Sequence, residues 1–192
     1  NFAKLATENS EDQSSAIKGG LLGYITAFMT FPEFEQPCFQ TPIGAISSIF
    51  RTQYGYHIIH VLDKRVARGK IKAAHIYLKK SEKPEVAEKQ IQEAYKQIIS
   101  KKITFENAVK KYTEDASTKE NYGILNEFGV SEMVNDFEEQ CFALKNPGEL
   151  SKPFMTEYGW HLVRLIEKIP VKGYEDSKDY IKQRMVSDPR VN

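Results

Sequence analysis

The sequence predicts an α+β fold built from two tandem copies of one small unit. Strand-like and helix-like segments follow in mixed order, one repeat runs through most of the 192 residues, and the composition suits a packed core. With 41% apolar and 28% charged residues, the chain is not expected to be disordered, fibrous or a small disulfide scaffold. Its net charge of +1 gives no reason to expect nucleic acid as a partner. No apolar run approaches the ~20 residues of a transmembrane helix.

The repeat becomes visible when the sequence is shifted against itself. A shift of 103 positions (105 − 2) aligns Phe2 with Phe105 and Cys38-Phe39 with Cys141-Phe142. After one inserted residue the shift becomes 104 (156 − 52), and the segment from Thr52 to His57 aligns with that from Thr156 to His161. A shift that persists this long, with a single slip, predicts two copies of one fold.

The two copies are unequal in length. Residues 71–104 precede Phe105 in the second copy, whereas only Asn1 precedes Phe2 in the first. We therefore expect an incomplete domain at 1–65 that lacks the first strand and first helix, a linker at 66–70, a complete domain at 71–169 and a C-terminal linker helix within 170–192. The two cysteines hold equivalent positions in different copies, so we expect free thiols in small core sites rather than a disulfide.

The elements of the complete copy follow from its sequence in order. Residues 73–78 predict a buried strand, and Pro84 suits the first turn of an amphipathic helix. Thr104 is expected to cap a second short helix, residues 123–128 to be extended, and Ser131 to cap a third helix.

A hairpin is expected to follow around Glu157-Tyr158-Gly159. Alternation places His161, Val163 and Leu165 on one face of its second strand, and Trp160, Leu162 and Arg164 on the other. Arg164 is expected to be solvated, and Glu35 and Glu138 to cap helices or face solvent. The order strand, helices, strand, helix, strand, strand is typical of an α+β domain with a small antiparallel sheet.

Several separated motifs in both copies resemble the parvulin family of peptidyl-prolyl cis-trans isomerases. In the first copy they are Ser10-Glu11-Asp12, Gly19-Gly20-Leu21-Leu22-Gly23 and Tyr54-Gly55-Tyr56-His57; in the second they lie between His75 and Ile166. The resemblance implies a parvulin (FKBP-like) fold, with a four-stranded antiparallel sheet surrounded by helices. Tandem parvulin domains with a following helix are similar to bacterial cell-envelope chaperone-isomerases, which implies a periplasmic or cell-envelope location.

The resemblance also implies a set of site residues. Its catalytic positions fall on His75, Asp115, Thr156 and His161, and the wall of its proline pocket falls on Leu125, Met133 and Phe137. The equivalents in the first copy are Asp12, Leu22, Phe34, Thr52 and His57. This copy departs from the family where Leu21 replaces an acid and where Thr30 stands at the position of the pocket methionine. The resemblance implies no cofactor or metal. His75, Asp115 and His161 are also dispersed along the sequence and do not have the spacing typical of metal ligands.

These residue types suit rotation about a peptide bond. The barrier of ~18–20 kcal/mol is lowered when the twisted amide is bound more tightly than either planar form, and no nucleophile is required. An apolar cup can hold the proline ring, while hydrogen-bonded histidines form a floor beneath the rotating carbonyl. The structural alternative is that both histidines are satisfied core residues, and that Met133 and Phe137 are ordinary core side chains.

The function expected from the sequence is a peptidyl-prolyl isomerase that assists folding, with proline-containing unfolded or extended polypeptides as partners. The alternative is a non-catalytic chaperone or peptide-binding module, and a weaker one is a spacer in a larger assembly. Loss of the first strand would expose backbone groups and apolar surface in the first copy. We therefore expect a missing segment, or strand exchange with another chain, to fill that gap.

Overall fold

The computed structural model describes residues 1–82 and 84–186, and its contacts divide the chain into two compact units. Unit 1 comprises residues 1–67 with the C-terminal segment from Lys172, and unit 2 comprises Arg68–Val171. Unit 1 contains α1 (Phe2–Asn9), α2 (Gln13–Ala16), α3 (Pro32–Gln40), β1 (Phe50–Thr52), β2 (Gly55–His57) and α7 (Tyr174–Val186). Unit 2 contains β3 (Lys70–Lys79), α4 (Pro84–Ile99), α5 (Phe105–Tyr112), the 3-10 turn η1 (Lys119–Asn121), α6 (Asn135–Ala143), β4 (Phe154–Thr156) and β5 (Gly159–Ile169).

Unit 2 is built on an antiparallel sheet with the order β3-β5-β4. β3 and β5 pair along their whole lengths, with a register shift between Lys72 and Ala73. The segment expected to form a fourth strand contacts β3 through isolated bridges, from Ile124 to Ala74 and from Phe128 to Ile71. The mixed α+β architecture agrees with the sequence, and the described sheet has three named strands plus these bridges.

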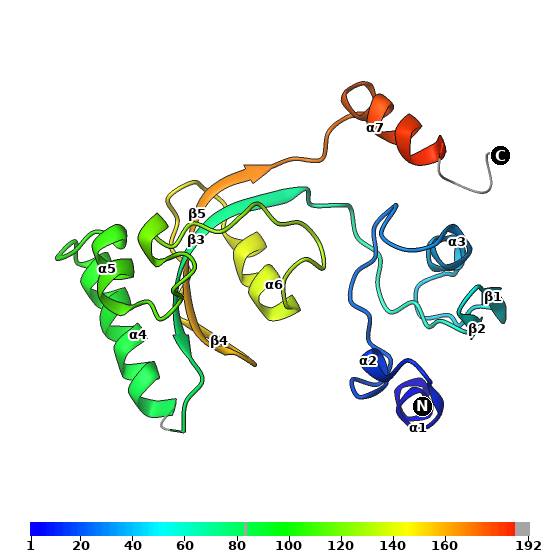
Figure 1. Ribbon diagram of the computed structural model, residues 1–192, viewed down its shortest axis with the longest axis horizontal. Coiled ribbons are helices and arrows are strands. Elements are labelled where there is room, and N and C mark those ends of the chain that lie inside the picture. Colours follow the sequence, from blue (N-terminus) through cyan, green and yellow to red (C-terminus); the bar gives the residue numbers. More distant parts are fainter. Residues whose placement is uncertain (83, 187–192) are drawn as a thin grey trace. The chain divides into compact units, whose positions relative to one another are not determined.

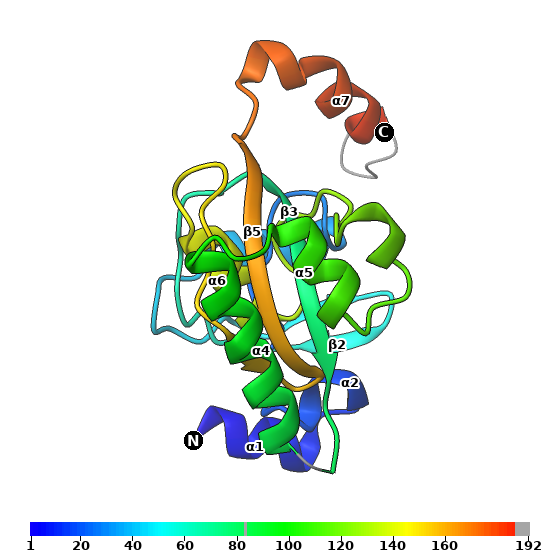
Figure 2. The same ribbon diagram turned by 90° about the vertical axis from the view of Figure 1, so that its left-hand side faces the viewer.

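Helices cover both faces of this sheet. α4 and α5 lie against one face and α6 against the other (Figures 1 and 2). Leu162 belongs to the core cluster on the α4–α5 side, with Trp160 packed against it, whereas Val163 and Leu165 belong to the cluster on the α6 side. The alternation expected along β5 is therefore confirmed, and the His161 face is the one covered by α6.

Helix ends agree with the sequence in part. α4 begins at Pro84, and the Thr104 hydroxyl accepts a hydrogen bond from the Asn107 amide, as expected for an N-cap. The expectation for Ser131 is wrong, because α6 begins at Asn135 and Ser131 lies outside it with a φ of 62°.

Arg164 also differs from expectation. It is not simply solvated: its guanidinium forms an ion pair with Glu106 at 2.7 Å and lies over the ring of Phe105.

Unit 1 repeats part of this plan. Its α1, α3, β1 and β2 correspond to α5, α6, β4 and β5, but the described residues contain no counterpart of β3 or α4. Ala16 is the one buried apolar residue in the described part of unit 1, whereas unit 2 contains two apolar clusters. Without a counterpart of β3, the described residues of the first copy form no closed apolar core.

α7 contacts the loop before α3. Tyr180 packs edge-on against Phe28, and Arg184 donates a hydrogen bond to the Phe28 carbonyl at 2.8 Å. The helix expected at the C-terminus is present from Tyr174 to Val186, while Asp188 and Pro189, where it was expected to end, lie outside the described residues. No helix within 1–82 or 84–186 has the length and apolar character needed to span a bilayer.

Candidate functional site

Two histidines come together on the α6-facing side of the unit 2 sheet. His75 lies on β3 and His161 on the neighbouring β5, and their ring centroids are 6.0 Å apart in a stacked arrangement. Each residue is only 7% exposed. The pair is thus a buried feature of the sheet, as the sequence predicted for both side chains.

Asp115 fixes the His75 ring. One Asp115 oxygen lies 2.8 Å from His75 Nε2 and also accepts a hydrogen bond from the Thr118 hydroxyl at 2.5 Å. Its other oxygen accepts from the hydroxyl and the amide of Ser117, at 2.6 and 3.0 Å. Four donors or ring atoms therefore surround this carboxylate, which leaves it suited to orienting His75 rather than to accepting a proton from a substrate.

Thr156 plays the corresponding part for His161. The Thr156 hydroxyl lies 2.9 Å from His161 Nε2 and accepts a hydrogen bond from the Tyr158 amide at 3.2 Å. Both residues are buried beside the β4–β5 turn. Nε2 of each histidine is thus engaged, whereas Nδ1 of each is buried without a hydrogen-bond partner among the described residues.

A close backbone approach supports the first histidine. Gly123 has a φ of 76°, and its carbonyl accepts the His75 amide hydrogen bond at 2.8 Å. A Cβ at this position would lie 2.3 Å from the His75 carbonyl oxygen. Glycine is required here both for the positive φ and for the short distance to β3.

Burial determines the charge of the imidazole pair. Desolvation, with a smaller contribution from the nearby His75, lowers the pKa of His161 to about 3. Desolvation also lowers the pKa of His75, against the opposing influence of Asp115. For Asp115 desolvation acts upward, but the hydrogen bonds from Ser117, Thr118 and His75 outweigh it and lower its pKa. At neutral pH the site holds two neutral imidazoles and one carboxylate.

The three apolar residues expected to form a proline cup lie in different environments. Phe137 is 4% exposed, and its ring meets His161 edge-on at 5.1 Å and His75 at 6.0 Å. Leu125 is partly buried against the same core cluster. Met133 is 36% exposed and lies just before α6. The structure therefore places Phe137 against both imidazoles and leaves Met133 available at the surface.

Glu138 holds the loop that precedes α6. It is 3% exposed, and its carboxylate accepts a hydrogen bond from the Met133 amide at 3.0 Å. Glu35 is 7% exposed and accepts from the Thr30 amide at the same distance. Each glutamate fixes the loop that leads into its own helix, so of the two expected outcomes, capping or facing solvent, the structure shows capping.

The first copy reproduces half of this geometry. The Thr52 hydroxyl lies 2.8 Å from His57 Nε2, and Phe34 meets His57 edge-on at 5.4 Å. Asp12 accepts hydrogen bonds from Ser14 and Ser15, as Asp115 does from Ser117 and Thr118. Hydrogen bonds to Ser14, the largest influence, and to Ser15 lower the pKa of Asp12. Leu22, the equivalent of Leu125, is 47% exposed.

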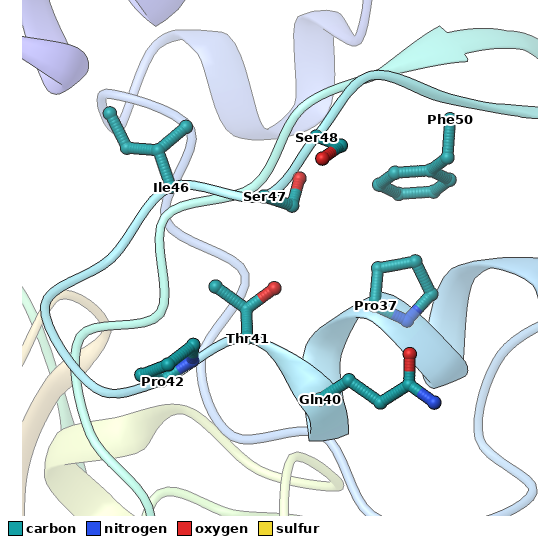
Figure 3. Close-up of a pocket in the computed structure, with 8 residues that line it drawn as sticks. All are labelled: Pro37, Gln40, Thr41, Pro42, Ile46, Ser47, Ser48 and Phe50. Atoms are coloured by element: carbon teal, nitrogen blue, oxygen red, sulfur yellow. The ribbon is translucent and has the colours of Figure 1, made fainter.

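Unit 1 also has a pocket outside these residues. It lies between the end of α3 and the segment before β1, has a volume of about 340 Å³, and is lined by Pro37, Gln40, Thr41, Pro42, Ile46, Ser47, Ser48 and Phe50 (Figure 3). The second copy has Leu144 at the position of Thr41, and Leu144 is buried in the α6-side cluster. A small polar residue in place of leucine is consistent with the opening in unit 1.

Tyr77 and Phe154 were missed as members of the imidazole site. The Phe154 ring stacks on His161 at 5.5 Å, and the Tyr77 ring stacks on its neighbour His161 at 5.1 Å. Tyr77 lies two residues after His75, so strand alternation could have placed it on the same face.

Both cysteines are free, as expected. Burial, with a smaller effect of Glu138, raises the pKa of Cys141 to about 12, so this thiol is an inert core residue. Within the described parts of the chain, no group of three His, Cys, Asp or Glu side chains is arranged to hold a metal ion.

Comparisons with known proteins agree with the internal repeat. Residues 71–167 and residues 1–65 each match a family model described as a PPIC-type PPIASE domain. The chain is 29% identical over 184 residues to Chaperone SurA of Pseudomonas putida, covering 93% of this chain and 43% of the relative. It is 31% identical over 185 residues to Chaperone SurA of Pseudomonas syringae pv. tomato, with the same coverage of 93% and 43%. The chain thus spans less than half the length of these relatives.

Solved structures with a similar chain path include a peptidylprolyl isomerase (PrsA) from Bacillus anthracis. The match has 27% sequence identity and a TM-score of 0.49, and it covers 65% of this chain and 55% of that one.

Proposed function

Because the chain belongs to the PPIC-type peptidyl-prolyl isomerase family, with two such domains in tandem, we propose that residues 71–169 form its competent isomerase domain. The observation that carries this proposal is the contact of Phe137 with both imidazoles on one sheet face. We assign His75, Asp115, Thr156 and His161 to the polar floor of the site, and Leu125, Met133 and Phe137 to the proline cup. Residues 1–65 are then the incomplete copy, 66–70 the linker, and the segment from residue 170 onward, which contains α7, the C-terminal linker.

The proposed mechanism is preferential binding of the twisted amide. The cup holds the pyrrolidine ring while the carbonyl of the preceding residue rotates over the neutral imidazoles. Transfer of that carbonyl from water to a buried site favours the twisted state, which has less charge separation than the planar amide. Asp115 and Thr156 act by orienting the rings, because their hydrogen-bonding capacity is already used within the protein.

Met133 provides a direct test because it is partly exposed and can be truncated without opening the core. We expect Met133→Ala to lower kcat/KM for a proline tetrapeptide about tenfold, since loss of part of the cup removes roughly 1.4 kcal/mol of apolar contact. The melting temperature should change little. Isomerisation is measured by NMR exchange spectroscopy on the peptide.

The matched control for this experiment is Met155→Ala. Met155 lies on β4 of the same unit and is 55% exposed, but strand alternation points it away from the His161 side. Wild-type turnover in both variants would show that the cup is assigned to the wrong residues. Absence of turnover in the wild-type protein, together with measurable peptide binding, would favour the non-catalytic chaperone.

We also propose that unit 1 binds an extended strand supplied by another chain. In unit 2, the backbone hydrogen bonds of successive β5 residues alternate in direction: one residue bonds to the β4 side, and the next bonds to β3. In unit 1, the Ile59 amide donates to the Ser47 hydroxyl and the Val61 amide donates to the Ala45 carbonyl. The amides of Ile58, His60 and Leu62, which alternate with these, form no backbone hydrogen bond among the described residues. Ile58 and Leu62 are 52% and 60% exposed. These features favour addition of a strand at this edge.

A peptide with the sequence of residues 70–79 tests this second proposal, because that segment fills the equivalent position in unit 2. We expect it to slow hydrogen exchange of the Ile58, His60 and Leu62 amides at least tenfold. A control peptide with lysine in place of Ile76 and Leu78 should have no such effect. Equal protection by both peptides, or by neither, would contradict strand addition.

The family relationship also leads to proposals about partners and location. We propose that the clients are unfolded or extended polypeptides containing proline, and that the protein acts in the periplasm or cell envelope. Both statements rest on the family relationship. Location is tested by fractionation of cells that produce the full-length protein, and a cytoplasmic fraction containing all of it would overturn the assignment.

A further inference from the structure

Tyr77, like Phe154, belongs to the imidazole cluster and has no role in the proposed reaction. It lies on β3 on the His75 side of the strand and directly opposite His161 in the β3–β5 register. Its ring stacks on His161 with an interplanar angle of 26°, and lies 6.1 Å from His75 at 9°. Unlike both histidines, Tyr77 is only half-buried. One side of its ring therefore covers the imidazoles while part of it remains accessible.

The polar groups of Tyr77 connect the two halves of the site. Its hydroxyl donates a hydrogen bond to the Tyr158 carbonyl at 3.0 Å, in the turn whose amide bonds to Thr156. Its backbone carbonyl accepts from the Glu114 amide at 2.7 Å, next to Asp115. Tyr77 thus fixes both the turn before His161 and the segment that carries the partner of His75.

The first copy shows which part of this geometry is independent of Tyr77. Unit 1 has no counterpart of β3 in the described residues, yet Thr52 and His57 still form their hydrogen bond at 2.8 Å. His57 is, however, only half-buried, whereas His161 is 7% exposed. The β3 side of the site, which includes Tyr77, therefore covers the imidazole but is not needed for the Thr–His hydrogen bond.

Tyr77 and the cup residue Phe137 flank His161. The Phe137 ring meets this imidazole edge-on, and the Tyr77 ring stacks on it, each with a centroid separation of 5.1 Å. The two rings are consequently at most about 10 Å apart, a span that neighbouring residues of an extended peptide can bridge with their side chains. The rotating carbonyl belongs to the residue before proline, so that residue lies on the imidazole side of the cup.

We propose that Tyr77 selects the residue before proline, by offering an aromatic edge on which a large apolar or aromatic side chain packs. The assignment rests on the proposed isomerase function of unit 2. A stacked or edge-to-face contact with an aromatic ring is worth about three- to tenfold in kcat/KM, so phenylalanine before proline is preferred over alanine by that factor. The hydroxyl acts separately, as a positioning group for the turn that holds Thr156.

The experiment measures kcat and KM of the full chain with two tetrapeptides that differ only in Phe-Pro and Ala-Pro. Wild-type protein should favour the first peptide at least threefold, mainly through KM. Tyr77→Leu should bring the ratio close to one. Tyr77→Phe should keep the ratio and lower kcat for both peptides about two- to fivefold, because the ring remains but the turn is released. Tyr95→Phe removes a tyrosine hydroxyl on the opposite sheet face and should change neither quantity.

The results separate this inference from the isomerase proposal. A wild-type ratio near one, or an unchanged ratio in active Tyr77→Leu protein, would overturn the role of Tyr77 while leaving isomerisation intact. If the leucine variant does not fold, the wild-type ratio still decides the question. If wild-type protein turns over neither peptide, the isomerase proposal fails. The ratio of the two peptide affinities, measured by fluorescence titration, then shows whether Tyr77 selects the residue before proline.

Discussion

Phe137→Ala is expected to lower the free energy of unfolding of unit 2 by about 3–5 kcal/mol and to abolish detectable isomerisation. The side chain is 4% exposed and contacts the rings of His75, His161, Phe128 and Phe154, so its removal leaves a cavity at the centre of the α6-side cluster. Urea unfolding followed by circular dichroism measures the first effect, and peptide exchange spectroscopy measures the second.

The first copy offers a matched control in Phe34→Ala. Phe34 has the same partners in Phe50 and His57 but is only half-buried, in a unit without an apolar core. We expect this change to cost less stability and to leave turnover at the wild-type level if unit 2 is the competent domain. A Phe137→Leu variant separates packing from binding, since it keeps most of the buried volume and loses the ring. Full activity in Phe137→Leu would contradict the role of the ring in the site.

The candidate site residues came from the parvulin resemblance, and the repeat supports them from within the sequence. Asp12 and Asp115 lie in the same pattern of hydroxyl donors, and Thr52–His57 and Thr156–His161 form the same hydrogen bond at 2.8 and 2.9 Å. A motif that occurs twice with the same internal spacing is not expected by chance. Strand alternation then identified the face on which His161 lies.

Other features depend on contacts that a single sequence does not specify. Tyr77 has the residue type and spacing of an ordinary strand tyrosine, and only the β3–β5 register shows that it lies opposite His161. Ser131 has the residue type of an N-cap, but the helix begins later and Glu138 supplies the capping oxygen from within the first turns. The segment expected to form a fourth strand pairs with β3 through isolated bridges, from Ile124 to Ala74 and from Phe128 to Ile71. These outcomes depend on tertiary register, which local propensity does not encode.

Acid is expected to destabilise unit 2 through its buried histidines. An unfolded histidine binds a proton near pH 6.5, whereas burial lowers the pKa of folded His161 to about 3 and also lowers that of His75. Between these values the unfolded state holds more protons than the folded state, so stability falls as the pH falls. The slope for one such histidine is at most about 1.4 kcal/mol per pH unit. Asp115 adds a loss of the same sign below about pH 4, because its folded pKa is also lowered.

His161→Gln isolates the histidine contribution because glutamine remains polar beside Thr156 but does not titrate. Urea unfolding at pH 7, 6, 5 and 4 should show a smaller loss of stability between pH 6 and 4 in the variant than in wild-type protein, by about 1 kcal/mol or more. The loss below pH 4 should persist, because it comes from Asp115. Parallel pH profiles for the two proteins would show that His161 is not held neutral by burial.

The same electrostatics predict how the reaction depends on pH. If the imidazoles serve as a neutral hydrogen-bonded floor, neither changes charge when the pH rises from 7 to 9, and desolvation, with Glu114 and Asp115 nearby, also raises the pKa of Tyr77. We therefore expect kcat/KM for the Phe-Pro peptide to vary less than twofold over that range. A bell-shaped profile centred near pH 7 would instead require a histidine that exchanges protons with the substrate, and the binding mechanism proposed for this site would then be wrong.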